Sequence, residues 1–218
     1  MAAIKAARRV EVNAKNNQIV ELDYVDKGIS IQIQTLTSLT LSHNKLTAVP
    51  AGIAELLNLE MLNLWNNRIE ELPTSISSLP KLRVLNLGMN RLWTLPRGFG
   101  SFPCLEVLDL TYNNLSEKSL PGNFFMLESL RALYLADNDF EMLPQDIRHF
   151  KNLQILVLRD NDLVYLPKEI GELGRNLNLS GDKQVFRLDN NPWVPPIVEQ
   201  LTVGIPQLLT YLASETYK

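Results

Sequence analysis

Residues 82–92 read LRVLNLGMNRL, and this stretch decides the fold because its pattern returns along the chain. Its asparagine belongs to a series of six that are 23 residues apart, with a single spacing of 25: Asn44, Asn67, Asn90, Asn113, Asn138 and Asn161. A fixed period of this length indicates an internal repeat, and such repeats stack into an elongated solenoid. Function is therefore expected on a surface of columns to which each repeat contributes one residue.

The apolar frame within each repeat is LxxLxLxxNxL, the pattern of leucine-rich repeats. In residues 59–64, Leu62 and Leu64 alternate with Met61 and Asn63, which predicts a short strand with one buried face. We therefore expect an α/β solenoid with a parallel concave sheet and about six regular repeats over residues 36–173. The six asparagines end the strands, where their amides can bond the backbone groups freed by each turn.

Both ends of such a solenoid need caps, because stacking leaves core residues open there. Residues 1–35 suggest a short helix and an edge strand, although the basic start of the chain also resembles a transit peptide. In residues 174–218 the register decays, so we expect a degenerate last strand near 177–179 and then capping helices, with Trp193 as a lid residue. The whole chain is expected to form one continuous domain.

Composition narrows the possible partners. The chain has 21 basic and 24 acidic residues, a net charge of −3, which does not favour nucleic acid or an anionic membrane surface. Its one cysteine, Cys104, cannot form an internal disulfide, which favours a reducing compartment. No apolar run is long enough to span a bilayer. We expect a monomer in the cytoplasm, without cofactor or metal.

The sequence offers few residues that could form a catalytic site. His43 and His149 occupy different positions of repeats that are far apart, and Cys104 stands where other repeats carry Asn58, Lys81 or Ser129. The phosphate-binding and metal-binding motifs of enzymes are missing from the sequence. The prediction is a protein that is not an enzyme, with a hydrolase or transferase kept as a remote alternative.

The outward columns of the strands are unusually rich in aromatic residues and methionine, with charges toward the later repeats. Such anchors surrounded by polar groups are typical of protein-binding surfaces. The aliphatic members Val84, Val107 and Ala132 could equally serve lateral packing between strands. The candidate binding residues on the concave face are Met61, Asn63, Trp65, Asn86, Met89, Asp109, Tyr112, Tyr134, Asp137, Val157, Arg159 and Asp160.

Stretches of sequence that lie partly outside the repeat pattern show a more specific resemblance. The stretches TLPRGFGS (94–101), SLPGNFF (119–125), RALYLADNDF (131–140) and KQVFRLDNNPWVPPI (183–197) are similar to the Ras suppressor protein family. That family consists of leucine-rich repeat adaptors at integrin adhesions. The resemblance covers nearly the whole chain, but the chain looks about one repeat shorter and lacks the family's basic C-terminal tail.

The resemblance implies an adaptor at focal adhesions that binds the last LIM domain of PINCH. Integrin-linked kinase and parvin would be reached through PINCH, and Ras-linked signalling, adhesion and migration would be affected. Family binding is attributed to the concave face, which here corresponds to Asp109, Tyr134, Arg159 and Asp160. The alternative within the same class is a leucine-rich repeat regulator that contacts a Ras-like GTPase or a phosphatase directly.

Overall fold

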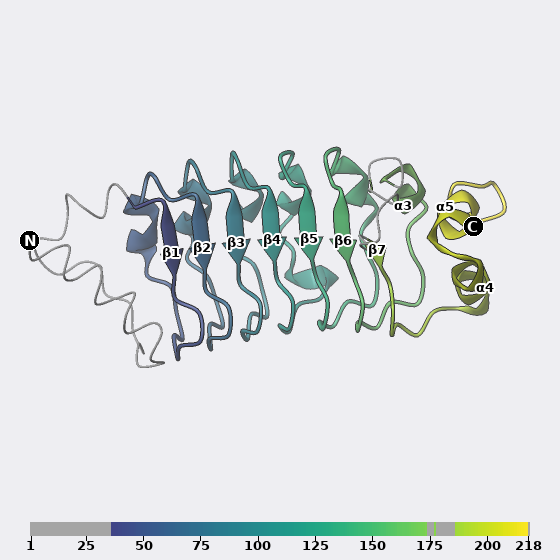
Figure 1. Ribbon diagram of the computed structural model, residues 1–218, viewed down its shortest axis with the longest axis horizontal. Coiled ribbons are helices and arrows are strands. Elements are labelled where there is room, and N and C mark those ends of the chain that lie inside the picture. Colours follow the sequence, from purple (N-terminus) through teal and green to yellow (C-terminus); the bar gives the residue numbers. More distant parts are fainter. Residues whose placement is uncertain (1–35, 174–176, 178–185, 218) are drawn as a thin grey trace, which may run out of the picture.

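The computed structural model describes residues 36–173, 177 and 186–217, and these form an elongated stack of similar turns (Figure 1). Each turn contributes one short strand to a parallel sheet whose order follows the chain, β1-β2-β3-β4-β5-β6-β7. This architecture confirms the predicted solenoid. The expected N-terminal cap at residues 1–35 lies outside the described residues.

The strands are short and in register from one repeat to the next. Leu39, Leu62, Leu85, Leu108, Leu133 and Leu156 pair along the middle of the sheet and are buried. Because neighbouring residues in a strand point to opposite faces, the residues on either side of each leucine face outward. The strands are β1 Ser38–Thr40, β2 Met61–Asn63, β3 Val84–Asn86, β4 Val107–Asp109, β5 Ala132–Tyr134, β6 Ile155–Val157 and β7 Phe186–Arg187.

The predicted asparagines form a buried ladder along the end of the sheet. Asn90 donates from Nδ2 to the carbonyl oxygens of Leu64 and Leu87, at 3.0 and 2.9 Å. Its Oδ1 accepts from the backbone N–H of Ile69, in the preceding repeat, at 3.0 Å. Each ladder asparagine thus ties its own turn to the one before it, and satisfies backbone groups that would cost about 1–3 kcal/mol each if buried unpaired.

Short 3₁₀ helices return the chain on the opposite side of the stack. A group of buried phenylalanines fills that side in the middle repeats, where Phe124 lies 6.2 Å from Phe99 and 5.8 Å from Phe150 between ring centroids. The insertion in the fourth repeat forms an extra 3₁₀ turn, in which the Ser119 hydroxyl donates to the Trp93 carbonyl at 2.7 Å. The 3₁₀ helices are η1 Ala51–Glu55, η2 Thr74–Ser78, η3 Phe99–Ser101, η4 Glu117–Ser119, η5 Phe124–Met126 and η6 Gln145–His149.

The last strand that the structure describes follows residues 178–185, and most of the predicted strand at 177–179 lies outside the described residues. β7 lies at Phe186–Arg187 and pairs with β6 through Leu156 and Val157. Asn191 then occupies the ladder position: its Oδ1 accepts from Leu163 N–H at 3.1 Å, and its Nδ2 donates to the Leu158 carbonyl at 3.0 Å. The ladder therefore has a seventh member, which stands 30 residues after Asn161 instead of 23.

Helices close the C-terminal end of the stack (Figure 1). They are α3 Glu169–Leu173, α4 Pro195–Val203 and α5 Ile205–Leu212. Buried Ile197, Leu208 and Leu212 join them to the core. Trp193 is half-buried against this end and donates from Nε1 to the Leu188 carbonyl at 3.0 Å. The Tyr217 hydroxyl donates to the Leu166 carbonyl, which fixes the last residues to the sixth repeat.

Candidate functional site

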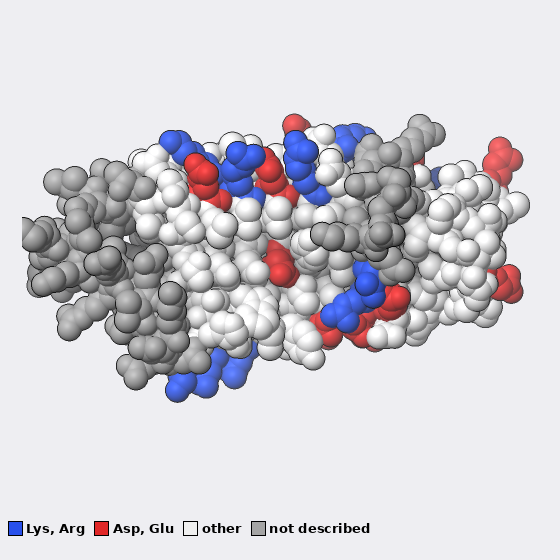
Figure 2. Space-filling view, viewed as in Figure 1, with Lys and Arg blue, Asp and Glu red and all other residues white. Residues whose placement is uncertain are grey.

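The exposed face of the sheet carries most of the candidate binding residues, and the pairing of the strands sets their order. The register places Asn86 beside Asp109, Asp109 beside Tyr134, and Tyr134 beside Val157. All four side chains are half-buried. Figure 2 shows that the middle of this face is mostly uncharged, while charged side chains gather along its two long edges. The face therefore offers a largely uncharged surface with polar groups at defined points.

Three polar members of this face also have a structural role that the sequence analysis missed. The side-chain oxygens of Asn63, Asn86 and Asp109 accept from the backbone N–H two residues further on, at 3.0, 3.0 and 2.9 Å. Such bonds stabilise the turn that follows the strand, because Asn and Asp can mimic a backbone turn. In each of these side chains, the oxygen that accepts this bond stabilises the turn, and the other polar atom is left for further hydrogen bonds.

The residue before each ladder asparagine has a left-handed backbone. Met89, Tyr112, Asp137 and Asp160 have φ between 52° and 59°, and His43, Asn66 and Asn190 share this conformation. Left-handed geometry is uncommon for residues other than glycine, and its return in every repeat shows that the turn requires it. The turn directs these side chains to the edge of the sheet face, where Tyr112 is 57% exposed.

An aromatic cluster lies at the N-terminal end of the face. The rings of His43 and Trp65 meet edge to face, with centroids 4.8 Å apart, and His43 Nδ1 lies 2.9 Å from Asn66 Nδ2. The indole of Trp65 also lies against Gly88 in the next repeat. Trp65 is therefore half-buried by its neighbours, which limit its orientation.

A charged cluster lies at the C-terminal end. The Arg159 guanidinium contacts Asp160 Oδ2 at 2.7 Å and Asp137 Oδ2 at 3.4 Å. Asn190 Nδ2 donates to the other Asp160 oxygen at 2.8 Å, and Arg187 pairs with Asp189 at 2.8 Å. The sequence analysis identified the members from the fifth and sixth repeats. It missed Arg187, Asp189 and Asn190 because it did not place the seventh repeat at these residues.

Two titratable groups on this face have shifted pKa values. Burial raises the pKa of Tyr134 above its ordinary value, and the negative charge of Asp109 adds to the increase. Burial also raises the pKa of Asp137; Arg159 opposes the increase and Asp160 adds to it. At neutral pH the Tyr134 phenol therefore keeps its proton and can both donate and accept a hydrogen bond.

The first residues of the strands form one outward column of the sheet, and some of them pack laterally between neighbouring strands. Ala132 is buried, and Val84, Val107 and Ile155 are half-buried between neighbouring strands. Met61 is the exception, since it is 42% exposed, and it accepts a contact from the Ser38 hydroxyl at 3.7 Å. Among these aliphatic residues, Met61 presents the most apolar surface to a partner.

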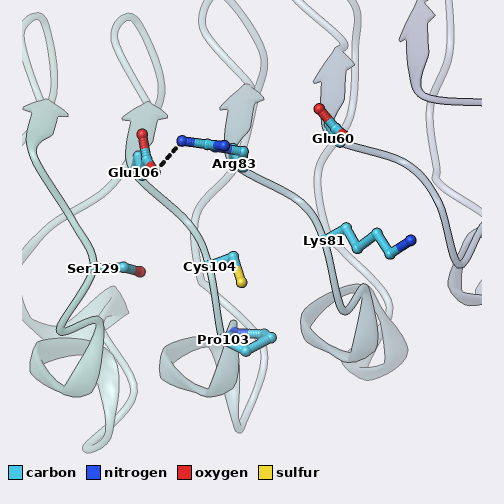
Figure 3. Close-up of a pocket in the computed structure, with 7 residues that line it drawn as sticks. All are labelled: Glu60, Lys81, Arg83, Pro103, Cys104, Glu106 and Ser129. Carbon is cyan, nitrogen blue, oxygen red and sulfur yellow. Dashed lines mark hydrogen bonds and ion pairs between the residues drawn. The ribbon is translucent and has the colours of Figure 1, made fainter.

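A hollow at the edge where the strands begin is lined by Cys104 (Figure 3). The cations around this exposed thiol are engaged elsewhere, because Arg83 pairs with Glu106 at 2.6 Å and Lys81 donates to Asn58 at 2.7 Å. Within residues 36–173, 177 and 186–217, no group of three His, Cys, Asp or Glu side chains is arranged to hold a metal ion. The helices of the described part are too short or too polar to cross a membrane.

Comparisons with known proteins agree with this geometry. The family described as Leucine rich repeat matches residues 34–92 and 58–115, and the Leucine-rich repeat region matches residues 94–203. Together with the stacked parallel strands, these matches define a leucine-rich repeat protein, a class whose members are generally non-enzymatic scaffolds that bind other proteins.

The chain is also similar over most of its length to proteins from three mammals. The chain is 61% identical to Ras suppressor protein 1 of Homo sapiens and of Bos taurus, and 57% identical to that of Mus musculus. Each match covers 96% of this chain and 85% of the relative. The chain therefore belongs to the Ras suppressor protein family. The matched span of 236 residues exceeds the 218 of this chain, so the relatives contain residues that this chain lacks.

Solved structures share the fold. A leucine-rich repeat protein of Leptospira interrogans superposes with a TM-score of 0.56 at 34% identity, over 78% of this chain and 47% of that protein. The ectodomain of the Arabidopsis thaliana receptor kinase GASSHO1/SCHENGEN3 gives a TM-score of 0.62 at 32% identity, over 74% and 19% of the two chains. That ectodomain was solved in complex with CASPARIAN STRIP INTEGRITY FACTOR 2.

Proposed function

We propose that this protein is an adaptor at focal adhesions, whose concave sheet binds a folded partner, the last LIM domain of PINCH. Integrin-linked kinase and parvin join through PINCH, and the assembly modulates adhesion, migration and Ras-linked signalling. The proposal rests on membership of the Ras suppressor protein family and on the surface chemistry of repeats four to seven. Binding requires no cofactor, and the protein itself performs no chemical step.

The observation that carries the proposal is the arrangement of Tyr134, which ends β5, and Arg159, which follows β6 in the next repeat. Asp137 and Asp160 hold the guanidinium of Arg159 by two ion pairs, so its orientation is set before a partner arrives. A pre-organised arginine loses little side-chain entropy on binding, and its remaining N–H groups are available to a partner. Tyr134 supplies apolar area and a hydroxyl beside it, a combination that is enriched at binding hot spots.

The two ends of the face suit different parts of a partner. The N-terminal end, with Met61 and Trp65, offers mainly apolar area, whereas the cluster around Arg159 offers directed hydrogen bonds and charges. Since apolar anchors supply affinity and charged groups fix orientation, a partner that spans both would bind in a single direction.

Calorimetric titration with the purified LIM domain tests the proposal. Arg159→Glu removes the donors and places a third acidic group beside Asp137 and Asp160, so we expect affinity to fall by about tenfold or more. The matched control is Arg83→Glu, which reverses an ion-paired arginine at the opposite edge and should keep the parental affinity. Circular dichroism checks that both variants fold.

Parental affinity in Arg159→Glu would place the binding site elsewhere. A parallel titration with a Ras-like GTPase covers the alternative partner. If the GTPase binds the parent protein and the LIM domain does not, the proposed partner is wrong.

A further inference from the structure

The residues that follow the first six ladder asparagines show a sorted charge pattern, and we call this column the descending edge. Along the stack its members are basic in the first three repeats, neutral in the fourth and acidic in the fifth and sixth: Lys45, Arg68, Arg91, Asn114, Asp139 and Asp162. All six are exposed. Figure 2 shows basic side chains along this edge beneath β1–β3, and acidic side chains together with basic ones beneath the later strands.

These charges are mostly not neutralised within the fold. Lys45, Arg68, Asp139 and Asp162 form no ion pair within the described part of the chain. Arg91 lies 4.0 Å from Glu70, with both side chains about 60% exposed, and exposed pairs of this kind contribute little. The descending edge therefore presents a positive half and a negative half to solvent.

We propose that the descending edge binds a second copy of this chain in antiparallel orientation, which gives a weak two-fold symmetric dimer. A two-fold axis between the third and fourth repeats, directed from the concave to the convex side, reverses the order of the column. The reversed order is complementary to the original, as a symmetric interface requires. The facing pairs are Lys45 with Asp162, Arg68 with Asp139 and Arg91 with Asn114, and each pair occurs twice.

The centre of this interface is apolar. Trp93, two residues after Arg91, is 56% exposed and lies outside the concave face. Trp93 belongs to the third repeat, which adjoins the proposed axis, so the axis brings the two copies of this side chain close together. Aromatic anchors surrounded by charged pairs are the usual anatomy of a specific protein interface.

One facing pair opposes association. Glu70 and Glu141 stand two residues after Arg68 and Asp139, in the second and fifth repeats. The same axis places these two glutamates opposite each other. This repulsion and the small number of contacts predict a dimer that forms only at high protein concentration and separates on dilution, where the expected monomer remains. Both concave faces stay open on the same side, so the inference does not depend on the proposed function.

Sedimentation velocity over a range of protein concentrations tests the dimer. At about 50 mM salt we expect the mean mass to rise with concentration toward twice that of the chain, and at about 0.5 M salt to stay close to one chain, because screening weakens exposed charge pairs. Arg68→Glu and Asp139→Lys should each weaken association about tenfold or more, since each creates two repulsive pairs. Lys151→Glu, a charge reversal away from this edge, should leave association unchanged.

The decisive variant is the exchange Arg68→Glu with Asp139→Lys, which restores complementary pairs only in the antiparallel register. Recovery of association in this double variant supports the proposal, and continued weakness overturns it. Glu141→Lys tests the register again: it should tighten the dimer by removing the opposed acids, and weakening would contradict the assigned pairs. A parent protein that stays monomeric at low salt and high concentration would also overturn the proposal.

Discussion

The Cδ1 atom of Trp65 lies 2.8 Å from the point where a Cβ atom of Gly88 would stand. A Cβ atom could stand there only if the indole of the preceding repeat moved, so the glycine allows this close approach. The contact covers part of the Trp65 ring, which is only partly exposed. The N-terminal end of the candidate surface is thus set by a pair of residues in neighbouring repeats.

Gly88→Ala should displace the indole, because the new methyl group also meets the Thr111 carbonyl oxygen at 3.3 Å. We expect the free energy of unfolding to fall by about 1–3 kcal/mol, as for other overpacked sites. Near-ultraviolet circular dichroism of the tryptophans and a urea titration measure the two effects. Gly122→Ala is the control, since nothing lies within 4 Å of its added Cβ. An unchanged tryptophan signal in Gly88→Ala would contradict the described packing.

The ladder should be most sensitive to substitution in the middle of the stack. Asn90→Ala leaves buried backbone groups of two repeats without partners and should cost about 1–3 kcal/mol for each group that water cannot reach. Asn191→Ala should cost less, because this rung is half-exposed and water can replace the lost bonds. Urea denaturation of both variants measures the difference. Equal losses would mean that burial does not determine how much a ladder asparagine contributes to the free energy of unfolding.

The raised pKa of Tyr134 predicts a loss of stability at alkaline pH. The folded state holds the neutral phenol more strongly than the unfolded state, so this contribution is complete below the ordinary tyrosine pKa of about 10. It is lost as the pH rises through the higher pKa of the folded state. Tyr134→Phe should remove this part of the alkaline destabilisation, and Asp109→Asn should lower the pKa of Tyr134 by removing a negative neighbour.

Nuclear magnetic resonance of the Tyr134 ring carbon follows its ionisation directly. Tyr217, whose pKa is also raised, stays unchanged in both variants and serves as the internal reference. Ionisation of Tyr134 at the same pH in the parent and in Asp109→Asn would exclude the proposed influence of the carboxylate.

Gly100 faces a more severe constraint than Gly88. A Cβ atom there would stand 1.7 Å from the carbonyl oxygen of Asn123, a backbone atom of the next repeat. Gly100→Ala can be accommodated only by separating the two repeats, so we expect a loss of about 3 kcal/mol or more. A thermal melt that coincides with that of the parent would contradict the packing of η3 against the following turn.

The sequence predicted the regular repeats well because one residue type recurs at one spacing and each copy has the same physical role. Asn191 could not be found in this way: it follows Asn161 after 30 residues, and stacking depends on position in space instead of spacing along the chain. The same limit concealed Arg187 and Asp189. The candidate surface was only partly predictable, since alternation identifies outward residues such as Trp65 and Arg159 but not their contacts with Gly88 or with Asp137 and Asp160.

Among the described residues, the side chain of each ladder asparagine from Asn67 onward bonds only to its own repeat and to the preceding one. The side-chain oxygen of each of these asparagines accepts from a backbone N–H of the preceding repeat, from Leu46 N–H on Asn67 to Leu163 N–H on Asn191. During synthesis the N-terminal repeats leave the ribosome first, and each of them still lacks the acceptor that only the following repeat supplies. Each turn of the nascent chain can therefore complete its hydrogen bonds only after the following repeat has emerged, so cotranslational folding should lag behind synthesis by one repeat.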